Sequence, residues 1–140
     1  MWKNTESMAS AIAEGLQNQG IKTKLISMSG NHRSDVAYEL LDAGALFVGS
    51  PTINNNIFPT IADVLTYLKG LKPQNLVGAA FGSYGWSGES VSQVEDLLRE
   101  MNVRLVAEGI KARNAPGAET LNACISLGAE VKKIWDETLR

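Results

Sequence analysis

The first residues that could do chemistry are Asn4, Thr5 and Glu6, which lead straight into an apolar pattern of helical spacing. Hydroxyl and amide side chains ahead of a helix place donors around an anion, and the helix dipole favours a phosphate there. A threonine in this place is more often an ordinary helix cap, so the segment taken alone predicts an N-cap at Thr5. Lys3 adds a cation that would suit a dianionic phosphate.

A second polar segment covers residues 50–56, directly after the apolar run 45–48. It contains three consecutive asparagines, which tolerate left-handed backbone conformations and supply amide donors and acceptors. A plain turn explains one or two of them. The whole run, placed after a strand expected to be covered on both faces, favours recognition of a polar, planar edge.

The third segment, residues 82–88, alternates glycines with larger residues. Glycine lets the backbone approach a ligand closely. Tyr84 and Trp86 are large aromatics on a predicted loop, where an aromatic can stack on a flat heterocycle. The alternative is that Trp86 covers the end of the sheet. Together the three segments predict a ligand with a phosphate at one end and a flat ring at the other.

The elements that must position these segments alternate along the chain. Helical patterns are expected at 5–20, 34–41, 59–68, 89–101 and 118–139, and strands at 21–28, 45–48, 76–81 and 103–112, the last with a kink near 108–109. Strands alternating with helices give a parallel sheet covered on both faces. We therefore predict a doubly wound α/β fold, in which ligands bind beyond the carboxyl ends of the strands.

Composition indicates one compact domain, because 140 residues suffice for one core and not for two. A formal net charge of −2 does not suit a nucleic-acid-binding protein. The sequence shows no apolar run of membrane length and no secretory signal pattern. Cys124 has no second cysteine to pair with, which fits a reducing compartment. These features predict a cytoplasmic location.

Four stretches resemble a known family: residues 2–9, 48–55, 58–71 and 80–88. They are similar to the flavodoxin-like domain of the A-type flavoproteins, also called flavodiiron proteins, and the resemblance covers essentially the whole chain. Short flavodoxins share the fold and the phosphate loop but usually lack the Ser-Tyr-Gly-Trp-Ser-Gly run. The resemblance implies one FMN-binding domain over residues 1–140, with strand order 2-1-3-4-5.

The resemblance also implies which residues bind the cofactor. The phosphate would be held by Met1, Trp2, Lys3, Asn4 and Thr5, the isoalloxazine lined by Pro51, Thr52, Ile53, Asn54 and Asn55, and its other side closed by Ser83, Tyr84, Gly85, Trp86, Ser87 and Gly88. Lys3 departs from the small residue common at its place in the family. No catalytic residue and no metal ligand is expected, because one histidine and no carboxylate cluster cannot assemble a diiron site.

Three functions remain open from the sequence. In the first, the chain is the flavin half of an oxygen or nitric oxide reductase. It would take electrons from a rubredoxin-like or reductase donor and pass them to a diiron domain. Alternatively it is a self-standing flavodoxin-like carrier, or a non-redox interaction module that has lost flavin. Each is compatible with a homo-oligomer. A phosphoacceptor receiver domain needs an aspartate at a strand end, where this chain has Gly-Ser.

The family has a strand immediately before the phosphate loop, and the present sequence opens inside that loop. In the order 2-1-3-4-5 this strand is central, and an empty slot would separate its neighbours by roughly 10 Å, twice the usual spacing. Each buried backbone group left without a partner costs on the order of 1–3 kcal/mol, against a domain stability of about 5–15 kcal/mol. We therefore expect a fragment, or a slot filled from elsewhere, and poor folding and FMN binding by the isolated residues.

Overall fold

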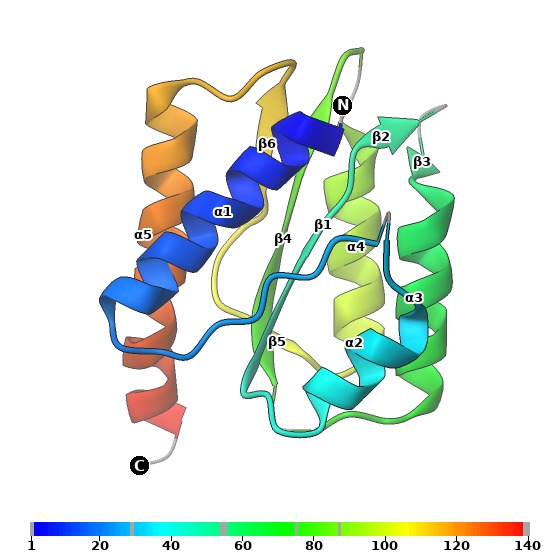
Figure 1. Cartoon of the computed structure of the whole chain (residues 1–140), viewed down its shortest axis with the longest axis vertical. Coiled ribbons are helices and arrows are strands. Elements are labelled where there is room, and N and C mark those ends of the chain that lie inside the picture. Colours follow the sequence, from blue (N-terminus) through cyan, green and yellow to red (C-terminus); the bar gives the residue numbers. More distant parts are fainter. Residues whose placement is uncertain (1, 29, 54–55, 75, 87, 139–140) are drawn as a thin grey trace.

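The computed structural model describes residues 2–28, 30–53, 56–74, 76–86 and 88–138. A central sheet separates two layers of helices (Figure 1). One face carries α1 (Trp2–Asn18) and α5 (Ala118–Thr138), and the other carries α2 (Arg33–Leu40), α3 (Pro59–Gly70) and α4 (Glu89–Glu100). The predicted doubly wound α/β architecture is therefore confirmed. No helix in the described ranges is long and apolar enough to cross a bilayer.

The sheet is built around β4 (Val77–Tyr84). β1 (Ala45–Gly49) pairs with one edge of β4, while β5 (Arg104–Leu105) and then β6 (Ile110–Arg113) pair with the other, all in parallel. β4 is buried along nearly its whole length, with Ala79 in the core under α1 and α5 and Ala80 in the core under α3 and α4. This alternation follows from the two-residue period of a strand, and it explains the continuous apolar run in the sequence.

One strand prediction is wrong, and a second is wrong in part. The segment 21–28 forms no strand, and Leu25 within it is 56% exposed. β1 is only half-buried at all five positions, although it was expected to be covered on both faces. Among the described residues β1 pairs with β4 alone. A strand is stable only when a neighbour satisfies its backbone donors and acceptors, and the apolar pattern of a segment does not say whether that neighbour exists.

Two helix starts also differ from prediction. α1 begins at Trp2, so Thr5 lies inside the helix and is not its N-cap. The cap of α2 is His32 and not Ser34. The Nδ1 atom of His32 accepts a hydrogen bond from the backbone N–H of Ser34 at 3.1 Å, and the backbone N–H of His32 donates to the Asp35 carboxylate at 2.8 Å. An imidazole nitrogen thus takes the place of the usual capping hydroxyl.

Candidate functional site

The amino end of α1, the segment after β1 and the carboxyl end of β4 lie at the same edge of the sheet (Figure 1). The Thr5 hydroxyl of α1 and the Ser83 hydroxyl near the end of β4 form a hydrogen bond of 2.8 Å. Both side chains are buried, at 4% and 0% exposure. The structure therefore brings together two of the three predicted segments by a direct contact between hydroxyl groups.

The segment after β1 forms a hairpin of β2 (Thr52–Ile53) and β3 (Asn56–Ile57), which the sequence did not predict. Thr52 pairs with Ile57, and Ile53 with Asn56. Pro51 and Thr52 are buried at the base of the hairpin. Asn54 and Asn55 lie outside the described residues, so their predicted contact with a ring stays a prediction.

At the third segment, β4 continues as far as Tyr84, so Ser83 and Tyr84 belong to the strand and not to a loop. Trp86 is 90% exposed, which contradicts the alternative that it packs over the end of the sheet. Gly88 is the N-cap residue of α4, and Ser87 lies outside the described residues. An exposed aromatic at the rim of the sheet edge is free to stack on a flat ligand.

The first turns of α4 add residues that the sequence reasoning missed. Ser90 is 1% exposed and contacts Thr52 and Ser50, while Gln93 contacts the outgoing strand of the hairpin. The sequence did contain a signal for Ser90, because it stands beside the apolar helical positions Val91 and Val94. A serine buried there needs a hydrogen-bonding partner.

Two consecutive acidic residues of α4 have different surroundings. The carboxylate of Asp96 forms an exposed ion pair with Arg99 at 3.1 Å. Glu95 instead accepts a hydrogen bond from the backbone N–H of Gly109 at 3.1 Å, and so ties α4 to the connection between β5 and β6.

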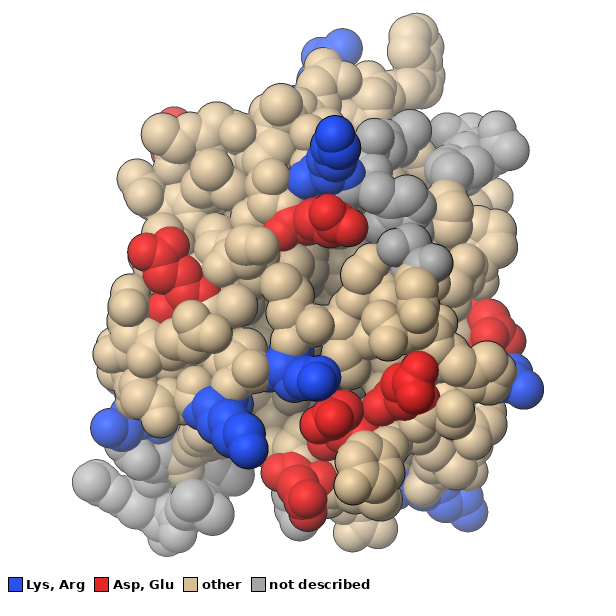
Figure 2. Space-filling model, in the orientation of Figure 1, with Lys and Arg blue, Asp and Glu red and all other residues tan. Residues whose placement is uncertain are grey.

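Acidic and basic residues nearly balance, with 15 of the first and 13 of the second. On the face seen in Figure 2, acidic and basic side chains are interspersed and form no field of one sign. Within the described ranges, no group of three or more His, Cys, Asp or Glu residues could hold a metal ion. At the sheet edge, Lys3 is an exposed cation in the first turn of α1, and Arg113 is another at the carboxyl end of β6.

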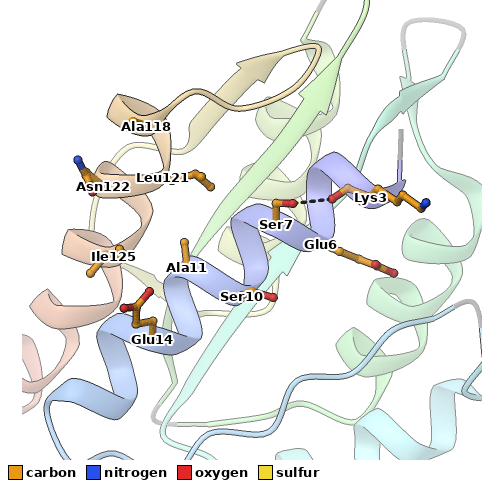
Figure 3. A pocket seen from close by; sticks show the side chains of 10 residues that line it. All are labelled: Lys3, Glu6, Ser7, Ser10, Ala11, Glu14, Ala118, Leu121, Asn122 and Ile125. Atoms are coloured by element: carbon orange, nitrogen blue, oxygen red, sulfur yellow. Dashed lines mark hydrogen bonds between the residues drawn. The ribbon is translucent and has the colours of Figure 1, made fainter.

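A shallow groove of about 800 Å³ runs between α1 and α5 (Figure 3). Its lining residues all come from these two helices: Lys3, Glu6, Ser7, Ser10, Ala11, Glu14, Ala118, Leu121, Asn122 and Ile125. Of these, Lys3 also belongs to the predicted cofactor site. The groove therefore lies beside the sheet edge and apart from the segments predicted to bind the ring.

Residues 1–128 match the family model described as flavodoxin. The chain belongs to the flavodoxin family. It is 44% identical over 132 residues to the nitric oxide reductase of Moorella thermoacetica, covering 94% of this chain and 33% of that protein. It thus spans about a third of the length of this curated relative.

Solved structures agree with this assignment. The rubredoxin oxygen:oxidoreductase of Desulfovibrio gigas superposes with a TM-score of 0.95 at 39% identity, covering 99% of this chain and 35% of that one. A flavodoxin from the domain Archaea superposes with a TM-score of 0.84 at 29% identity, covering 96% and 92%. This flavodoxin domain is therefore homologous to the flavin domain of flavodiiron oxygen and nitric oxide reductases. Family membership implies FMN as the cofactor.

The donors at the sheet edge fit FMN chemically. The amino end of α1 offers backbone N–H groups without intrahelical partners, and the cation Lys3 stands beside them. A Cβ atom on Gly82 would overlap the carbonyl oxygen of Ser50, so a glycine is required where the second and third segments meet.

Proposed function

We propose that this chain is the FMN-binding electron-transfer domain of a flavodiiron-type oxygen or nitric oxide reductase. The observation that carries the proposal is the meeting of the three predicted segments at one sheet edge, in a chain 44% identical to a nitric oxide reductase over 94% of its length. The proposed domain comprises residues 1–140. A rubredoxin-like or reductase protein would donate its electrons, and a diiron domain would accept them.

The cofactor is assigned to the residues named from the sequence. Residues 1–5 would hold the phosphate, residues 51–55 would line one side of the ring, and residues 83–88 would close the other. Bound FMN supplies one- and two-electron redox chemistry that side chains lack. In this proposal the amino end of α1 would bind the phosphate, the β2–β3 hairpin and the end of β4 would orient the ring, and Trp86 would limit access of water. No covalent step by a side chain is needed.

The decisive test is the visible spectrum of the purified protein, with the chain as it occurs in its natural polypeptide. We expect the absorption bands of oxidised flavin and one FMN per chain on titration. A protein that neither carries nor takes up FMN would contradict the proposal and support the non-redox module.

Trp86 provides a sharper test of where the ring lies. Replacing Trp86 with alanine removes a stacking contact worth about 1 kcal/mol, so the FMN dissociation constant should rise about fivefold. Tyr38→Ala is the matched control, because Tyr38 is also an exposed aromatic, at 73%, but lies on α2. Equal FMN affinity in Trp86→Ala and the wild type would remove Trp86 from the site.

A self-standing electron carrier is the second candidate, favoured by the archaeal flavodoxin, which this chain covers over 92% of its length. The two candidates differ in what lies beside the flavin in the same polypeptide. Reduction of O2 or NO by the natural polypeptide, dependent on bound iron, would support the reductase, whereas electron transfer to a separate protein without such activity would support the carrier.

A further inference from the structure

The incoming strand of the β2–β3 hairpin is attached to the first turn of α4. The Thr52 hydroxyl donates to the Ser90 hydroxyl at 2.7 Å and accepts from the Ser90 backbone N–H at 3.2 Å. The Ser90 hydroxyl in turn donates to the carbonyl oxygen of Ser50 at 3.0 Å. All three residues are buried. Ser90 therefore holds both residues that flank Pro51, Ser50 and Thr52.

The outgoing strand is attached to the same helix by Gln93. Its Oε1 atom accepts from the backbone N–H of Ile57 at 2.6 Å, and its Nε2 atom donates to Oδ1 of Asn56 at 3.1 Å. Gln93 follows Ser90 by three residues, so both side chains lie on one face of α4. Each strand of the hairpin therefore has its own contact with α4.

The base of the hairpin is closed by Ser50. Its hydroxyl donates to the carbonyl oxygen of Pro51 at 2.8 Å and accepts from the backbone N–H of Phe58 at 2.9 Å, eight residues further on. A hairpin with strands of two residues is marginal by itself in water. Its position must therefore come from these side-chain contacts with the rest of the domain.

We propose that Ser90 and Gln93 are positioning residues, which hold the β2–β3 hairpin where the isoalloxazine ring requires it. This inference rests on the proposed function, since the hairpin carries part of the proposed ring site. Neither residue belongs to the segments assigned to FMN. A hairpin already in place needs no ordering when the ligand binds, which raises affinity, and a fixed hairpin also fixes the polar groups that tune the flavin potential.

A substitution at Gln93 tests the positioning of the hairpin without disturbing the folded core. Gln93 is only half-buried and lies outside both apolar cores, whereas Val91, Val94 and Leu98 on the same helix are core residues. Removing its amide therefore leaves the packing of α4 intact. Substitution of Ser90 should cost more stability, because its buried hydroxyl bridges two partners and removing it takes one hydrogen bond from each of them.

The test compares Gln93→Met and Ser90→Ala with two matched controls in the purified protein. Gln17→Met makes the same change at an exposed position of α1, and Ser92→Ala does so at an exposed position of α4. We expect Gln93→Met and Ser90→Ala to raise the FMN dissociation constant about tenfold, which corresponds to about 1.4 kcal/mol, and to shift the midpoint potential of the bound flavin. The controls should match the wild type in both.

Hydrogen exchange of the FMN-free protein reports on the hairpin independently. The Ile57 amide should exchange faster in Gln93→Met than in Gln17→Met. Faster exchange with wild-type FMN affinity and potential would overturn the proposal, because the contact would then be merely structural. Unchanged exchange would overturn it too, since Gln93 would not hold the strand. If Ser90→Ala fails to fold, Gln93→Met decides. A wild-type protein that binds no FMN would instead refute the proposed function, and this inference with it.

Discussion

Thr5 and Ser83 are separated by 78 positions in the sequence, and their hydroxyls lie 2.8 Å apart in the buried part of the site. A second buried pair, Thr52 and Ser90, links the hairpin to α4 in the same way. Hydrogen bonds in such surroundings are strong, and a group deprived of its partner is costly. Neutral hydroxyls therefore hold these segments together, and the proposed phosphate would meet the amino end of α1 and Lys3.

At the residue scale we predict that Thr5→Val lowers the free energy of unfolding by about 1 kcal/mol, because it removes a buried hydrogen bond while keeping the side-chain volume. Thr66→Val, at an exposed position of α3, is the control and should change stability less. Denaturant melts measure both. A double-mutant cycle with Ser83→Ala should show a coupling of about 1 kcal/mol, and strictly additive effects would speak against the bond.

At the scale of elements, α1 and α5 approach each other backbone to backbone. A Cβ atom on Gly15 would overlap the carbonyl oxygen of Ile125, and one on Gly128 would overlap that of Ile12. The two glycines thus set the distance between the helices that cover one face of the sheet. Because α1 also carries the proposed phosphate site at its amino end, this contact helps to aim that end at the edge of the sheet.

We predict that Gly15→Ala destabilises the domain by about 2 kcal/mol or more. Helix propensity alone would favour alanine by about 1 kcal/mol, but the overlap with rigid backbone outweighs it. Gly70→Ala is the control, since its Cβ atom would meet nothing within 4 Å at the end of α3. Thermal melts of both variants test the contact, and a Gly15→Ala protein as stable as Gly70→Ala would disprove it.

At the scale of the whole molecule, two apolar cores on opposite faces of the sheet support the fold, and the ion pairs found among the described side chains are exposed. Exposed pairs add little stability. Cys124 is fully buried in the core under α1 and α5, and burial raises the pKa of its thiol from 9.0 to about 11. Cys124 is thus a small core residue of α5.

This burial predicts a pH dependence of global stability. Between pH 9 and about 11 the unfolded thiol loses its proton while the folded thiol keeps it, so unfolding becomes more favourable as the pH rises. The contribution is negligible below pH 9 and reaches a loss of about 1 kcal/mol near pH 10. Denaturant melts at pH 8 and pH 10 should show a smaller loss for Cys124→Ala than for the wild type. Equal losses would contradict the shift.

Much of the fold and part of the site could be predicted from local patterns. The continuous apolar run of β4 indicated a strand buried on both faces, and the alternation of strands and helices determined the fold class. That class then predicted where the three polar segments would meet, because the carboxyl ends of parallel strands share one edge. The buried contact between Thr5 and Ser83 follows from this rule.

The sequence alone therefore determined the fold class, the family resemblance and the segments proposed to meet the cofactor. Only the tertiary structure revealed the β2–β3 hairpin, its attachment to Ser90 and Gln93, and the failure of 21–28 to form a strand. The attachment of the hairpin and the pairing of a strand both depend on partners distant in the sequence. A local pattern reports the preference of a segment, whereas hydrogen bonds between segments depend on which neighbours the fold brings within reach.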